Sequence, residues 1–363
     1  MVAPRTPGVY IEEFHIRSTP IQGLPTSAAG FVAVTGRGPL LGPLLSFADF
    51  EHVATSNFGV NLPLAVRGFF ENGGHTLYIS RIAANDPLES GLAALGAQPI
   101  SIVCCPDEST IPNAAAALAA HCASRQDRIG ILQSSEPVIP VATHQPPVNS
   151  TYAAYYYPWI TVRSLDGSST VAMPPGGHIA GIYAQTDTNR GVWIAPANVA
   201  LLGVTAISQN VTDLESNLLN SRGIDLIRSF PAQGIKVWGA RTTASEGSDW
   251  KYIPVRRLLI FIEQSVLPGI QWAVFEPNGP ALWAAVSSAV QDFLASLWKL
   301  GAFQGTTQQE AYFVRCDLTT MTQNDLDNGR LVCVVGVAPV RPAEFVIFQI
   351  AICTQYPPKL SGK

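Results

Sequence analysis

The stretch ISIVCCPDESTIPNAAAALAAHCASRQDRIGILQ, residues 100–133, decides the fold class. It opens with an apolar run at 100–105 and closes with another at 128–133, and both are typical of strands buried on two faces. The alanine-rich segment between them, at 112–123, predicts a helix, because alanine has the highest helix propensity. A strand, a helix and a second strand in this order predict a parallel crossover, and hence an α/β fold with a largely parallel sheet.

The same alternation of apolar runs and helix-forming segments extends on both sides of this unit. Further strands are predicted at residues 31–36, 77–82, 155–162, 224–227, 235–241, 311–316 and 330–339. Further helices are predicted at residues 46–53, 64–72, 174–185, 212–220, 252–266 and 280–300. Residues 84–99 are expected to be a short polar connection, and residues 134–151 a loop rich in Pro, Ser and Thr.

Both ends of the chain carry a strand-forming segment without an obvious local partner. Near the N-terminus, prolines disfavour a helix and residues 9–14 predict one short strand. Residues 344–355 predict a long strand rich in β-branched and aromatic side chains. An unpaired edge strand promotes aggregation. The terminal strand therefore either pairs within its own sheet or, like the N-terminal segment, adds to the sheet of a neighbouring molecule.

The composition of the chain is unusually poor in charge, and a surface partly covered by other chains would explain it. Only 13% of the 363 residues are charged, whereas 47% are hydrophobic; the charged share is roughly 25% in average soluble proteins. This balance excludes a disordered chain. An apolar α/β enzyme would explain it equally well. The net charge of −4 and the lack of a basic stripe argue against a nucleic-acid partner.

The helix predicted at 281–300 is apolar on more than one face. Its main stripe consists of Leu282, Val286, Val290, Phe293, Leu297 and Leu300, and three further apolar residues lie off the stripe, namely Trp283, Leu294 and Trp298. A helix that is apolar most of the way round is buried in a core or against a partner. The sequence leaves these two alternatives open.

Motifs that would indicate catalysis or cofactor binding are not found. The chain has no phosphate-binding loop, no HExxH and no GxSxG. Asp107 follows a predicted strand and His121 lies on a predicted helix, but nothing in the sequence brings them together. The six cysteines show no metal-ligand spacing and are expected to be free and mostly buried. We therefore expect no enzyme, no cofactor and no metal, with a cytoplasmic α/β hydrolase as the alternative.

No signal peptide or bilayer-spanning segment is predicted. Residues 1–8 contain two prolines and an arginine but no apolar core, and the longest apolar stretch, at 281–300, contains Asp292 and Lys299. We expect the chain to be made in the cytoplasm and not to insert into membranes.

Motifs along nearly the whole chain resemble, in the same order, the contractile tail sheath proteins of myophage tails, R-type tailocins and contractile injection particles. The opening TPGVYIEE at 6–13 resembles the N-terminal signature of that family. The other matching segments lie at residues 21–36, 72–81, 174–181, 190–198, 237–242, 252–257, 275–278 and 297–305.

The resemblance implies a domain organisation. It comprises an N-terminal arm at 1–20, a first core part at 21–99 with a minimal insertion at 84–99, a subtilisin-like α/β domain at 100–245, an α+β C-terminal sheath subdomain at 246–340, and a C-terminal strand arm at 341–363. The subtilisin motifs around its catalytic His and Ser are absent, so the fold likeness implies no activity.

The resemblance also implies a function. Such subunits polymerise helically around an inner tube and contract from a metastable extended state to drive that tube through a target envelope. The inter-subunit arm residues would be Val9, Tyr10, Ile11, Glu12, Phe14, Phe345, Val346, Ile347, Phe348, Ile350 and Ile352. The candidate tube-facing helix would use Val286, Val290, Asp292, Phe293, Leu297 and Lys299.

The implied partners are further copies of the chain, the inner tail tube protein, baseplate and tail-terminator or cap proteins, and sheath paralogues. The particle would assemble in the bacterial cytoplasm and form part of a virion tail or a released extracellular device. A tail tube or baseplate subunit is the alternative within the same class.

Overall fold

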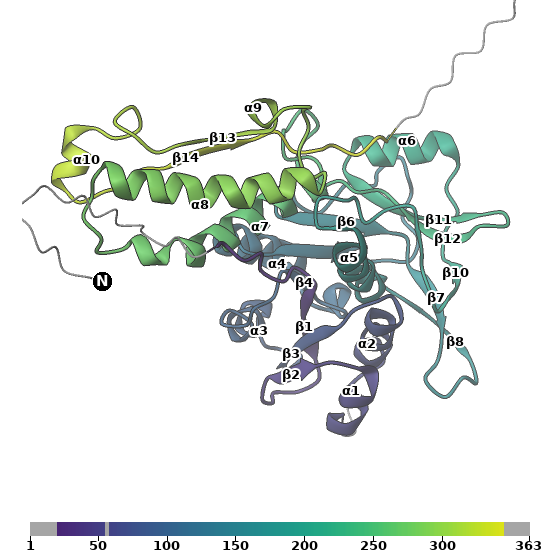
Figure 1. The fold of residues 1–363 in the computed structure, drawn as a ribbon. Coiled ribbons are helices and arrows are strands. Elements are labelled where there is room, and N and C mark those ends of the chain that lie inside the picture. The colour runs from purple at the N-terminus through teal and green to yellow at the C-terminus, as the bar shows by residue number, and fades with distance from the viewer. Residues whose placement is uncertain (1–19, 55–57, 345–363) are drawn as a thin grey trace, which may run out of the picture.

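The computed structural model describes residues 20–54 and 58–344. Nine strands form its central sheet: β1 (Ala28–Val34), β2 (Leu41–Leu44), β3 (Thr76–Ile82), β4 (Ile102–Cys104), β5 (Ile129–Gln133), β6 (Ala153–Tyr157), β9 (Val199–Ala200), β11 (Ile224–Phe230) and β12 (Gly234–Trp238). Their spatial order is β2-β3-β1-β4-β5-β6-β11-β12-β9 (Figure 1). The strands from β3 to β11 in that order are parallel, and the outer pairings are antiparallel. The predicted, largely parallel α/β sheet is confirmed.

Helices cover both faces of this sheet (Figure 1). One face carries α1 (Phe47–Val53), α2 (Asn61–Glu71) and α5 (Gly176–Arg190), and the other carries α3 (Leu88–Ala94), α4 (Ala114–Arg125) and α6 (Asp213–Ser221). Alternate residues of β1 enter opposite cores, since Phe31 belongs to the first cluster and Val32 to the second. Burial on both sides explains why the parallel strands are continuously apolar in sequence.

Two details of the sequence prediction are wrong. Residues 84–99 contain helix α3, in which Leu88 and Leu92 are buried against the sheet. The predicted strand at 155–162 is two strands, because the chain turns at Pro158. The second of them, β7 (Ile160–Arg163), leaves the central sheet and pairs antiparallel with β8 (Thr170–Met173) and β10 (Val204–Ile207).

The C-terminal part is built on two long helices, α7 (Ile253–Gly269) and α8 (Pro280–Lys299). A two-stranded sheet of β13 (Tyr312–Arg315) and β14 (Val334–Val337) packs along α8. The short elements are η1 (Glu108–Thr110), η2 (Gln271–Ala273), α9 (Gln308–Ala311) and α10 (Gln323–Asp327). Most apolar residues of α8 are buried within the chain. This favours a core helix over a helix that is buried against a partner.

A buried ion pair connects the central and C-terminal parts. Arg257 on α7 makes two 2.7 Å contacts with the carboxylate oxygens of Asp187 on α5. The same guanidinium donates to the carbonyl of Thr26 at 2.9 Å and lies over the ring of Tyr183. Both charged side chains are 3% exposed. One cation thus holds three separate chain segments together.

We expect Arg257→Met to destabilise the fold strongly, because it leaves the Asp187 carboxylate buried without a cation. Breaking a buried pair in this way costs about 3–5 kcal/mol. The free energy of unfolding in urea measures the loss. Arg330→Met is the matched control, since its pair with Asp325 is long and exposed and should contribute less than about 1 kcal/mol. Equal losses in the two variants would contradict this role of Arg257.

Candidate assembly interface

The two-stranded sheet has an inner and an outer face. Tyr312 pairs with Val337 and Val314 with Val335. The side chains of Tyr312, Val314 and Val337 pack into the core cluster of α7 and α8, whereas Val335 stays 39% exposed. Phe313 points outward and is half exposed, and its ring lies across Gly336, where it leaves no room for a side chain. Within the described residues the sheet has only these two strands. Its outer backbone edges can therefore accept an added strand.

The described chain begins and ends at firmly held positions. Ile21 belongs to the core cluster of α7 and α8, and the amide of Leu24 donates to Ser265 Oγ at 3.0 Å. At the other end, Arg241 donates two hydrogen bonds, of 2.9 and 2.6 Å, to the carboxylate of Glu344. The first described residues lie beside α7, whereas the last lie near α6 (Figure 1). Both terminal segments therefore continue from fixed anchors.

The C-terminal anchor is electrostatic. Arg241 is 5% exposed, and its guanidinium also donates to the carbonyl of Asn220. The Tyr252 hydroxyl donates a third hydrogen bond to Glu344, at 3.3 Å. Burial acts to raise the pKa of Glu344, but the hydrogen bonds and charge of Arg241 outweigh it and hold this pKa below its ordinary value.

The predicted arm residues lie outside the described part of the chain. This holds for the whole set at 9–14 and for the whole set at 345–352. The expectation that they join neighbouring subunits therefore stays a prediction.

The six residues predicted to face a tube lie on two sides of α8. Four of them are buried in the C-terminal core and cannot present their side chains to a partner, namely Val286, Val290, Phe293 and Leu297. Their assignment to a tube-facing surface is therefore wrong, because these side chains hold α8 against the chain's own C-terminal core. Asp292 and Lys299 lie on its exposed side.

An exposed apolar loop between α7 and α8 was not predicted as a site. Phe275 is fully exposed and Val274 about 60% exposed, and Leu267 in the last turn of α7 is equally exposed. The backbone of Phe275 has a φ of 70°, which an aromatic residue rarely adopts. Solvent-exposed, strained aromatic residues are typical of contact sites. The sequence showed only the motif FEPN and gave no sign of its exposure.

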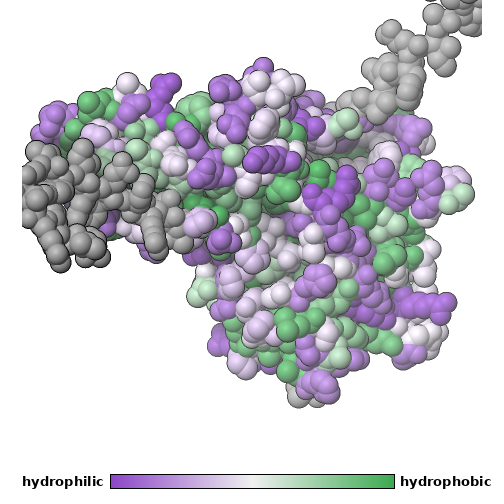
Figure 2. All heavy atoms as spheres, in the orientation of Figure 1, coloured by the Kyte–Doolittle hydropathy of each residue, from purple (hydrophilic) through white to green (hydrophobic). Residues whose placement is uncertain are grey.

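Hydrophobic residues are also scattered among hydrophilic ones over the face shown in Figure 2. Large exposed apolar side chains include Leu45, Leu214, Leu300 and Leu318. This surface agrees with the low charge of the chain and leaves apolar area that further contacts would bury.

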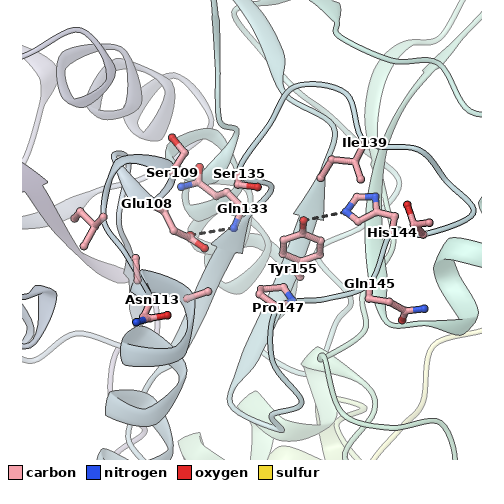
Figure 3. A pocket seen from close by; sticks show the side chains of 14 residues that line it. Glu108, Ser109, Asn113, Gln133, Ser135, Ile139, His144, Gln145, Pro147 and Tyr155 are labelled. Carbon is pink, nitrogen blue, oxygen red and sulfur yellow. Dashed lines mark hydrogen bonds between the residues drawn. The ribbon is translucent and has the colours of Figure 1, made fainter.

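A cavity of about 420 Å³ lies beyond the carboxyl ends of β4 and β5, where α/β enzymes place their active sites (Figure 3). Burial raises the pKa of Glu108 there to about 8, although its carboxylate accepts a bond from the Gln133 amide. Burial also lowers the pKa of His144 to about 4, and its Nε2 lies 2.9 Å from the Tyr155 hydroxyl. Among the described residues, no hydrogen bond joins this histidine to a serine or an acid. The cavity does not contain an assembled catalytic triad.

The two residues considered as a catalytic pair have separate surroundings. Asp107 accepts bonds from the Val34 amide and the Asn61 side chain, which tie the end of β1 to α2. His121 lies half-buried on α4. No group of three potential metal ligands occurs in residues 20–54 and 58–344, and no helix there is long and apolar enough to cross a membrane.

Comparison with known families identifies the type of protein. Residues 83–243 match the model described as "Phage tail sheath protein central domain", and residues 245–353 match "Phage tail sheath C-terminal domain". Together these matches cover most of the chain. The chain belongs to the phage tail sheath family.

Solved sheath structures agree along almost the full length of this sheath-family chain. The contracted sheath complex of the PVC extracellular contractile injection system is 31% identical, with a TM-score of 0.82, covering 98% of this chain and 99% of that one. The contracted helical sheath of the anti-feeding prophage is 36% identical, with a TM-score of 0.80, covering 96% and 99%. A chain of the anti-feeding prophage baseplate is 35% identical, with a TM-score of 0.76, covering 97% and 100%.

Curated tail sheath relatives are longer. The tail sheath protein of Burkholderia phage BcepMu is 26% identical over 219 residues, which is 57% of this chain and 44% of that protein. The matched stretch spans half or less of the length of such relatives.

The stability that the Glu344–Arg241 ion pair contributes should depend on pH. Because its folded pKa is lower than its unfolded value near 4.3, the Arg241 pair stabilises the fold above that pH and is lost as pH falls through the folded pKa. We expect Glu344→Gln to unfold at a lower urea midpoint at pH 7, and the difference from the native sheath chain to shrink by pH 3. Glu246→Gln is the control, because Glu246 is exposed and 3.8 Å from Arg241. A difference that does not change with pH would contradict the prediction.

Proposed function

We propose that this chain is the structural subunit of a contractile sheath. It polymerises helically around an inner tail tube and contracts from a metastable extended lattice to drive the tube through a target envelope. The observation that carries the proposal is full-length similarity, above 30% identity, to sheath chains of two contractile particles. A contact between different surfaces of identical subunits builds such open helical polymers.

The proposed connections between subunits are strand additions. Residues 9–14 and 344–355 would pair with the open edges of the β13–β14 sheet in neighbouring copies. The anchors at Ile21 and Glu344 support this, because each lets a terminal segment leave from a fixed point on a rigid body. The segments would act as tethers that keep the lattice connected while the bodies move.

Contraction would be driven by additional burial between subunits. Apolar surface contributes about 25 cal/mol per Å² removed from water. A few hundred Å² per subunit therefore corresponds to several kcal/mol, multiplied over many copies. The exposed apolar residues, Phe275 and Leu318 among them, supply such surface. The mechanism requires no cofactor.

The remaining assignments belong to the same proposal. Asp292 and Lys299 on α8 would make polar contacts with the tube, and baseplate, terminator and paralogous sheath proteins would be further partners. The central layer would be subtilisin-like in fold only, with domain limits at 100–245 and 246–340. The particle would assemble in the bacterial cytoplasm and act as a virion tail or a released device.

Electron microscopy of the purified chain, alone and with its tube protein, tests this function. We expect hollow cylinders or striated tubes from the full chain. A small oligomer that hydrolyses test esters would instead support the hydrolase alternative, and a narrow tube without a sheath would support a tube subunit.

Deletion of residues 1–20 should leave a folded body that does not assemble, because it removes the predicted arm and keeps Ile21, which belongs to the core cluster of α7 and α8. Circular dichroism and thermal melting measure the folding, and microscopy measures the assembly. Tyr10→Pro or Ile11→Pro, which removes a backbone donor, should block assembly in the full chain. Normal sheaths from the deletion variant would contradict the arm proposal.

The exposed Phe275 should contribute to assembly but not to folding. Asparagine tolerates a positive φ, so Phe275→Asn removes the ring without adding backbone strain. We expect an unchanged or higher melting temperature of the monomer and a critical concentration for polymerisation raised about tenfold or more. Leu45→Asn is the control, because Leu45 is another exposed apolar residue, at 63%, but lies beside β2. Identical polymerisation of both variants would contradict a contact between Phe275 and a neighbouring subunit.

A further inference from the structure

Two cysteines face each other where the two-stranded sheet ends. In the register of β13 and β14, Tyr312 pairs with Val337 and Arg315 pairs with Val334. One position further along the same register, Cys316 lies opposite Cys333. The sequence does not suggest this pairing, because 16 residues separate the two cysteines and the register is set only by the fold.

The hydrogen-bonding pattern places this pair at a position that suits a disulfide. The amide of Ala338 donates to the carbonyl of Ala311 at 2.8 Å, which marks that opposed pair as hydrogen-bonded. Hydrogen-bonded and non-hydrogen-bonded pairs alternate along antiparallel strands, so Cys316 and Cys333 occupy a non-hydrogen-bonded pair. At such pairs the Cα atoms lie about 4.5 Å apart, within the range of about 4.4–6.8 Å found for disulfides.

The surroundings of the two thiols differ. Cys316 is 8% exposed and packs against Trp283 and Met321, whereas Cys333 is half-buried. Each thiol affects the pKa of the other, which agrees with their opposed positions in the strand register. Burial raises the pKa of both thiols, that of Cys316 to about 12, so the more accessible Cys333 is the one to react first.

We propose that Cys316 and Cys333 form a redox modification site that becomes an intramolecular disulfide when the chain meets a small-molecule disulfide. The Cys333 thiolate attacks one sulfur of that oxidant and displaces its first thiol. The Cys316 thiolate then attacks the mixed disulfide and displaces the second. Two protein thiols are oxidised to one disulfide, and the oxidant is reduced to two thiols.

The new bond would close the loop at 317–332, which carries α10. Closing a loop restricts the unfolded chain and stabilises the folded one. In the reducing cytoplasm the thiols stay free, whereas an oxidising exterior favours the bond. The use of this bond in a released particle rests on the proposed function, but its formation in the isolated chain does not.

Peptide mapping after oxidation tests the proposal. The chain is treated with oxidised glutathione in the Cys353→Ser background, because Cys353 shares a tryptic peptide with Cys333. Without reduction, we expect peptide 316–330 joined to peptide 331–359, and a fall in free thiols, counted after denaturation, from five to three. Cys333→Ser in the same background should lose the linked peptide. Absence of the link, with five thiols remaining, would overturn the proposal.

Thermal melting gives a second, independent measure on the unassembled chain. Oxidation should raise the melting temperature by several degrees in the Cys353→Ser chain and by none when Cys333→Ser is added. No rise in either chain, despite a mapped bond, would overturn the stabilising role. Both assays use the monomer, so a failure to polymerise would affect the proposed function and leave this result unchanged.

Discussion

The fold depends on one desolvated cation. Arg257 belongs to α7, yet its guanidinium satisfies the Asp187 carboxylate of α5 and the Thr26 carbonyl of the first described segment. Taking two charges out of water is costly unless their geometry is nearly ideal. The guanidinium reaches this geometry only when α7, α5 and the segment around Thr26 meet at one point. The pair therefore specifies how the central sheet and the C-terminal helices are joined, whatever its net contribution to stability.

The central sheet could be predicted from sequence because its chemistry is local. Strands covered on both faces are apolar throughout, and the residues between them have high helix propensity. Helix α3 was missed because its burial depends on tertiary contacts: Leu88 and Leu92 pack on the sheet from a short segment that contains a glycine. The three-stranded sheet was missed because a turn at Pro158 resembles a break within one strand.

The candidate interface was less predictable than the fold, since the exposure of a side chain depends on the direction in which it points. Composition showed that α8 is apolar almost all round, but only the packing reveals that Val290 and Phe293 face inward while Asp292 and Lys299 face outward. The exposure of Phe275 and the pairing of Cys316 with Cys333 depend on loop conformation and strand register, which no local pattern encodes. The cavity beside Glu108 lies where α/β enzymes place their active sites, but its lining residues do not form a catalytic triad.

The turn between β7 and β8 offers a practical opportunity. Residues 164–169 are rich in serine and mostly exposed, and they project from the three-stranded sheet, at the far end of the molecule from β13 and β14 (Figure 1). Hydrogen bonds among Ser164, Asp166 and Ser168 close the turn on itself, so a foreign peptide spliced there would disturb little beyond it. Such a graft would decorate the subunit with a ligand or label while β13 and β14 stay untouched.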